Sequence, residues 1–229
     1  MVQVPVLLLS TPTNAPALAL GTNKVASIFG TFSATASYLR KIKPDFATAL
    51  PMAIAAFIAA AIGANIAVNL KPQIITWIII IALGFAWLFI VLRPSLGMEQ
   101  DLRWAGRKRH VALATVAGVA IGFYDGLVGP GTGTFLILAL VAGLGYSFLD
   151  ASVMAKIVNL GTNIAAIVVF GISGAILWQV GLTMAVFNVA GAILGAHSAL
   201  RWGNKYVRVV FLVIAGGLLL RLLWGQLVG

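Results

Sequence analysis

The sequence predicts an all-α membrane protein, and three observations carry that prediction. The chain of 229 residues is 61% hydrophobic and only 9% charged, whereas a soluble domain has about 25% charged residues. Its mean hydropathy is +1.06. Residues 157–200 form one long uncharged run, which favours helices because the strands of a membrane barrel alternate apolar and polar positions. We therefore expect a polytopic bundle of helices in a lipid bilayer.

Apolar stretches predict the elements in chain order. A short apolar stub, residues 2–9, comes first. Six longer stretches predict membrane spans, because about 20 apolar residues in a helix cross the hydrocarbon core. They are residues 22–39, 46–70, 73–92, 151–172, 176–200 and 207–223.

Two shorter apolar limbs, residues 111–124 and 132–146, lie between the third and fourth of these spans. At roughly 14 and 15 residues, each limb is too short for a bilayer of about 30 Å. We therefore expect a re-entrant hairpin that enters and leaves on the same face. Its glycine-rich turn would lie inside the membrane, where only protein or a water-filled cavity can satisfy irregular backbone.

The two halves of the chain repeat at an offset of 132 positions. Lys24 matches Lys156, and the small-residue stretch 59–67 matches residues 191–199 without a gap. Internal repeats of this size are typical of transporter folds. The prediction is an N-terminal repeat of residues 1–92, a polar linker of residues 93–110 and a C-terminal repeat of residues 111–229.

The basic loops predict that these repeats are inverted. The net charge is +10, and short basic loops stay on the cytoplasmic side of a membrane. Residues 40–45 carry three cations, whereas the matching loop, residues 171–174, carries none. The linker carries five, so we expect it to be cytoplasmic. In the first half only the second limb of the matching hairpin, residues 2–9, is present, so we expect that hairpin to be incomplete and to lack its first half-helix.

The turn of the hairpin, "GFYDGLVGPGTGTF", is the first candidate site. Glycines free backbone amides, and the N-terminus of a following half-helix suits an oxyanion. The alternative is a packing turn, because Gly118, Gly122 and Gly126 are spaced by four and allow close helix contact. The amide donors predicted for the anion site are those of Gly129, Gly131, Thr132 and Gly133.

Two lysines in apolar helices are the second candidate. An ionisable residue at membrane depth indicates a functional site, so Lys24 and Lys156 are predicted to bind a substrate or a counter-ion; alternatively each extends to the membrane surface. Asp125 is the only acid at the expected depth, where it would either couple protons or pair with a lysine. The polar residues predicted to complete the substrate site are Thr22, Asn23, Tyr124, Asn159, Thr162 and Asn163.

Several classes of function lack the residues they require. The chain has no cysteine and two isolated histidines, which argues against a metal site. No serine–histidine or paired-carboxylate arrangement stands out, so we predict neither an enzyme nor a cofactor. The basic residues fall in short loops of a membrane protein, where they indicate which loops are cytoplasmic. We therefore expect no nucleic-acid partner.

At "ALGTNKVASIFGTFSA", "GFYDGLVGPGTGTF" and "AKIVNLGTN" the chain resembles the sulfite exporter TauE/SafE family, also called the 4-toluene sulfonate uptake permease family. The resemblance covers essentially the whole chain. It implies a multi-pass transporter of the bacterial inner membrane for sulfite, sulfoacetate or other organosulfonates. Members usually carry a glycine-rich run before the segment matching "VQVPVLLL", and this chain lacks it.

We therefore expect a secondary transporter that moves a small sulfur-containing anion by alternating access between the two halves. An anion channel with the same site is one alternative, and a non-transporting membrane scaffold or assembly subunit is another. The expected partners are the small anion and the lipid bilayer, and the sequence leaves a homo-oligomer open.

Overall fold

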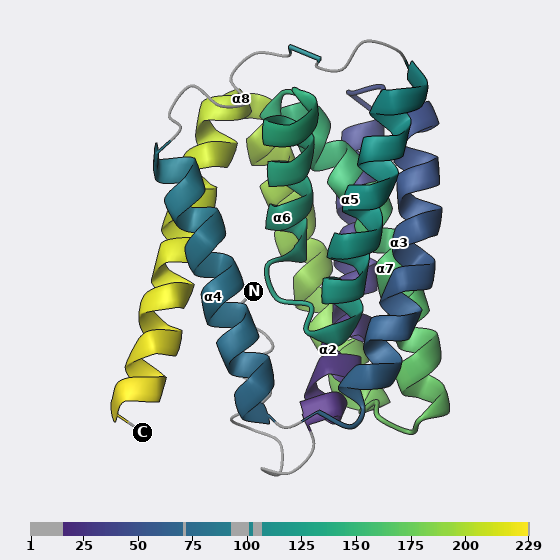
Figure 1. The fold of residues 1–229 in the computed structure, drawn as a ribbon, viewed down its shortest axis with the longest axis vertical. Helices are drawn as coiled ribbons and strands as arrows, with labels where there is room; N and C mark the ends of the chain where they lie inside the picture. The colour runs from purple at the N-terminus through teal and green to yellow at the C-terminus, as the bar shows by residue number, and fades with distance from the viewer. Residues whose placement is uncertain (1–15, 71, 93–100, 103–106, 229) are drawn as a thin grey trace.

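The computed structural model describes residues 16–70, 72–92, 101–102 and 107–228, and every regular element in this part of the chain is a helix (Figure 1). The predicted all-α class is therefore confirmed. Within these described residues, four helices are long and apolar enough to cross a membrane: Phe46–Ala67, Arg107–Leu127, Phe148–Ile172 and Trp178–Ile214. The predicted stub, residues 2–9, lies outside the described residues, as does the incomplete first hairpin.

The described part of the first half contains α2 (Pro16–Leu39), α3 (Phe46–Ala67) and α4 (Pro72–Leu92). The prediction placed the start of the first span at residue 22, six residues too late. Gly21 does not interrupt α2; it lies against the backbone carbonyl of Ala175 instead.

The second half contains α5 (Arg107–Leu127), α6 (Thr132–Leu138), the π-helical segment η1 (Ala139–Gly143), α7 (Phe148–Ile172) and α8 (Trp178–Val228). The backbone of α8 breaks at Gly203, where φ is 71°. The two parts of α8 correspond to the two predicted spans 176–200 and 207–223.

The helices α5, α6 and η1 form a hairpin whose limbs run side by side (Figure 1). His110 Nε2 near the start of α5 lies 2.9 Å from Tyr146 Oη, just after η1, so both outer ends of the hairpin meet. The predicted length of the first limb was wrong: α5 has 21 residues and spans about 31 Å. The helix includes the basic residues 107–109 at its start, whereas the predicted apolar limb began only at residue 111.

The helix α5 packs on α3 through a stripe of glycines. A Cβ atom on Gly122 would lie 2.5 Å from the backbone oxygen of Ala56, and one on Gly126 would collide with the backbone of Ala60. Close contact of this kind needs glycine, since any side chain would push the helices apart. These glycines therefore pack α5 against α3, which is the alternative role that the sequence suggested for them.

The helix starts recur at the predicted offset. The first residues of α2 and α7 are 16 and 148, and those of α3 and α8 are 46 and 178, which differ by 132 in both cases. The packing partners also follow the repeat. Helix α2 packs on α8, and its counterpart α7 packs on α3, which is the counterpart of α8. These observations agree with a repeat, whereas the inverted orientation of its halves stays a prediction.

Candidate functional site

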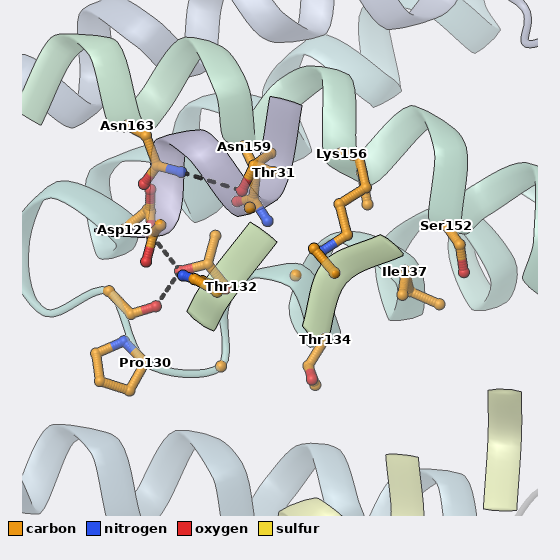
Figure 2. Close-up of a pocket in the computed structure, with 18 of the residues that line it drawn as sticks. Thr31, Asp125, Pro130, Thr132, Thr134, Ile137, Ser152, Lys156, Asn159 and Asn163 are labelled. Atoms are coloured by element: carbon orange, nitrogen blue, oxygen red, sulfur yellow. Dashed lines mark hydrogen bonds between the residues drawn. The ribbon is translucent and has the colours of Figure 1, made fainter. Parts of the chain in front are cut away.

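A cavity of about 490 Å³ lies among α2, the hairpin turn, α7 and α8 (Figure 2). It brings together residues that are far apart in the chain, from Asn23 on α2 to Ile214 on α8. Most of the predicted site residues line this one cavity. They are Asn23, Lys24, Asp125, Gly129, Gly131, Thr132, Gly133, Lys156, Asn159 and Asn163.

Three predicted site residues lie beside the cavity and contact other parts of the chain. The Thr22 hydroxyl accepts a hydrogen bond of 2.9 Å from the amide of Leu177, which holds α2 against the start of α8. Tyr124 donates a hydrogen bond of 2.6 Å to the backbone oxygen of Pro130 and so braces the hairpin turn. Thr162 donates to a backbone carbonyl of its own helix. These contacts support the walls of the cavity.

One of the two lysines is neutralised inside the protein. Lys24 Nζ lies 2.8 Å from Asp125 Oδ2, and the side chains of both residues are 4% exposed. Thr132 donates a hydrogen bond of 2.6 Å to the other carboxylate oxygen. Of the two roles left open for Asp125, pairing with a lysine is thus present. Lys24 is a buried member of an ion pair and does not extend to the surface.

Gly129 makes room for this ion pair. Its φ is 86°, a backbone conformation that side chains rarely adopt. A Cβ atom there would lie 3.4 Å from Lys24 Nζ. The amides of Gly129 and Thr132 already donate to the backbone oxygens of Tyr124 and Gly129, at 3.4 and 3.3 Å.

The other lysine is placed differently. Lys156 points from α7 into the cavity (Figure 2). Within the described residues its amine forms no ion pair with a carboxylate. Ser152 lies one turn before it and Asn159 one turn after it, and both line the cavity. The cavity therefore contains an amine that is available to a ligand.

The amides of two asparagines complete the wall on α7. Asn159 Nδ2 lies 3.2 Å from the position that a Cβ atom on Gly133 would take, so the two sides of the cavity approach closely here. Asn163 Nδ2 donates a weak hydrogen bond of 3.4 Å to Thr31 Oγ1 on α2. Both asparagines keep acceptor or donor capacity for a ligand, since an amide group can form several hydrogen bonds.

Sequence reasoning missed five polar residues of the cavity: Ser27, Thr31, Thr134, Ser152 and Asn188. Three of them had a usable signal. Ser152 lies four positions before Lys156, and Ser27 lies three positions after Lys24, so each shares the helical face of a lysine. Thr31 is the counterpart of Asn163 at the offset of 132, as Ser27 is of Asn159. Thr134 and Asn188 have no such relation to the lysines.

Among the described residues, the lining of the cavity offers the amine of Lys156, side-chain amides and hydroxyls. Groups of these kinds donate hydrogen bonds to anions. In the described part of the chain, no three His, Cys, Asp or Glu side chains gather as a metal site would require.

Comparison with known proteins agrees with this description. The family model for the sulfite exporter TauE/SafE matches residues 1–222. A probable membrane transporter protein from Sinorhizobium sp. is 34% identical over 97% of this chain and 84% of its own length. Similar proteins from Haemophilus influenzae and Escherichia coli K12 are each 30% identical, over 99% and 92% of this chain and 87% and 77% of their own lengths.

No solved structure matches the chain. The relatives are membrane transporters and not enzymes, which confirms the prediction that the chain is not an enzyme. The whole-chain family match and these relatives make it a multi-pass membrane transporter of the sulfite exporter TauE/SafE family.

Proposed function

We propose that this transporter moves small sulfur-containing anions, such as sulfite, sulfoacetate or other organosulfonates, across the bacterial inner membrane by alternating access. Residues 93–110 would lie on the cytoplasmic side. The observation that carries the proposal is the amine of Lys156, which faces a cavity of about 490 Å³ without a carboxylate partner among the described residues.

Physical reasons support an anion at this point. A cation at membrane depth costs free energy, and a bound anion recovers part of that cost when it enters. Asn159 and Asn163 present amide donors on the same helix as Lys156, and sulfonate or sulfite oxygens accept hydrogen bonds from such groups. The cavity volume is at the small end of ligand sites, which suits a compact anion.

The ion pair of Lys24 and Asp125 is the candidate for energy coupling in this proposal. Protonation of Asp125 would remove the charge that holds Lys24 and would weaken their contact of 2.8 Å. The pair joins α2 to the hairpin, so its release would let these elements separate.

The test is anion binding to purified protein in lipid nanodiscs, with sulfite, sulfoacetate and methanesulfonate as probes. We expect saturable binding of at least one anion to the wild type. Lys156→Met should weaken that affinity roughly thirtyfold or more, since losing one partner of a buried charged contact costs about 2 kcal/mol or more. Lys43→Met, at an exposed lysine outside the cavity, is the control and should bind as the wild type does.

Unchanged binding by Lys156→Met would place the anion elsewhere and contradict the proposal. Uptake into proteoliposomes then separates the mechanisms. Alternating access predicts a rate that saturates with anion concentration, whereas an anion channel would show a rate that keeps rising over the same range. No uptake of any probe would favour a scaffold.

A further inference from the structure

We infer that the cavity is matched in charge to a monoanion, so that bisulfite or an alkanesulfonate binds better than sulfite dianion, sulfate or sulfoacetate. This inference rests on the proposed function and narrows its substrate class. Three features support it: the charges that face the cavity, the pairing of Lys24 with Asp125, and the cost of bringing a second negative charge into the cavity.

Among the described residues, three that line the cavity are ionisable: Lys24, Asp125 and Lys156. The elements around Lys156 contribute neutral groups otherwise, such as Thr134 from α6 and Asn188 from α8. Arg208 on α8 does not line the cavity in the described structure. With both lysines protonated and Asp125 ionised, the described lining carries a single positive charge.

The carboxylate of Asp125 is already paired inside the protein. Asp125 accepts from Thr132 at 2.6 Å through one oxygen and contacts Lys24 at 2.8 Å through the other. The carboxylate thus uses both oxygens within the protein, and it occupies the position beside Lys24 that a second anionic group of a ligand would need. Lys24 is already compensated before any substrate enters.

Ligands of different charge would meet different conditions in this cavity. A monoanion compensates Lys156 and leaves the buried pair intact. A dianion either carries an uncompensated charge into the membrane or draws Lys24 away from Asp125, which leaves a buried carboxylate without its counter-ion. A neutral ligand leaves Lys156 uncompensated. One negative charge is therefore the favoured ligand charge.

The experiment begins with wild-type protein in nanodiscs and three probes. Methanesulfonate is a monoanion across the working pH range, sulfate is a dianion, and sulfite changes from monoanion to dianion near neutral pH. We expect methanesulfonate to bind about tenfold or more tightly than sulfate. Sulfite affinity should fall as pH rises while that of methanesulfonate changes less. Equal or tighter binding of sulfate, or sulfite affinity that rises with pH, would overturn the inference.

A charge change at the pair gives an independent test. Asp125→Asn leaves Lys24 uncompensated, so the ratio of methanesulfonate to sulfate affinity should fall by about tenfold. The double variant Lys24→Met/Asp125→Asn restores one net charge and should restore the ratio. A folded Asp125→Asn protein with an unchanged ratio would contradict the inference. Where that variant does not fold, the wild-type comparison and the double variant decide.

The two proposals fail in different ways. If no anion binds to the wild type, the proposed function falls and the charge inference falls with it. If methanesulfonate and sulfate both bind through Lys156 without discrimination, the proposed function stands and only the monoanion inference is overturned.

Discussion

Asp45 joins three segments at the predicted cytoplasmic end of the protein. Its Oδ2 accepts hydrogen bonds from Thr48 at 2.7 Å and from Tyr146 at 3.0 Å, and its Oδ1 lies 3.2 Å from Arg107. Tyr146 also lies 2.9 Å from His110. The start of α3, the start of α5 and the segment before α7 are therefore held together by one carboxylate.

This carboxylate predicts a dependence of stability on pH. Burial raises the pKa of Asp45, but the donors Thr48 and Tyr146 and the charge of Arg107 outweigh burial and hold it below 3.8. The folded state thus binds fewer protons than the unfolded state, so the stabilisation is present above the ordinary pKa and is lost as pH falls through the lowered one. We expect the melting temperature of the wild type to fall more steeply below about pH 4 than that of Asp45→Asn. Parallel melting profiles in detergent would contradict this.

The ionisable residues of the site were predictable from the sequence, but their partners were not. A lysine or aspartate in an apolar run stands out by composition alone, so Lys24, Asp125 and Lys156 were found. The pairing of Lys24 with Asp125 depends on the packing of α2 beside the hairpin, which no local pattern encodes. For the same reason the sequence could not show that the hydroxyls of Thr22 and Tyr124 bond to backbone groups.

At the scale of elements, the glycine stripe on α5 sets its distance from α3. Gly126→Ala should lower the free energy of unfolding by about 2 kcal/mol, because the new methyl group collides with the backbone of Ala60. Thermal unfolding in detergent measures the effect. Gly217→Ala is the matched control, since nothing lies within 4 Å of a Cβ atom there. Equal melting temperatures for the two variants would show that α5 can shift without cost.

The boundaries of most elements followed from apolar runs and loops. The predicted end of α2, at residue 39, matches the structure. The errors occurred where a helix continues beyond its apolar residues. For example, α5 begins within the basic segment, at residue 107. The π-helical turns of η1 were not foreseen, because one widened turn leaves no distinct period in the sequence.

At the scale of the whole molecule, the predicted topology places the loop 40–45 and the loop 171–174 on opposite sides of the membrane. The chain has no cysteine, so single cysteines can report their own side. Lys43→Cys should react with a membrane-impermeant maleimide only from the cytoplasm, and Ser173→Cys only from outside. Both positions are exposed. Labelling of both from one side would contradict the inverted arrangement.

The contact between Thr31 and Asn163 has a consequence for ancestry. Their positions differ by 132, so each residue touches its own counterpart in the other half. An axis that relates two similar halves must pass close to such a contact, as it does where two identical subunits meet. If the two halves derive from one ancestral sequence, the same amino acid stood on both sides of this contact and had to pair with a copy of itself. Threonine and asparagine can both do so, because each donates and accepts hydrogen bonds.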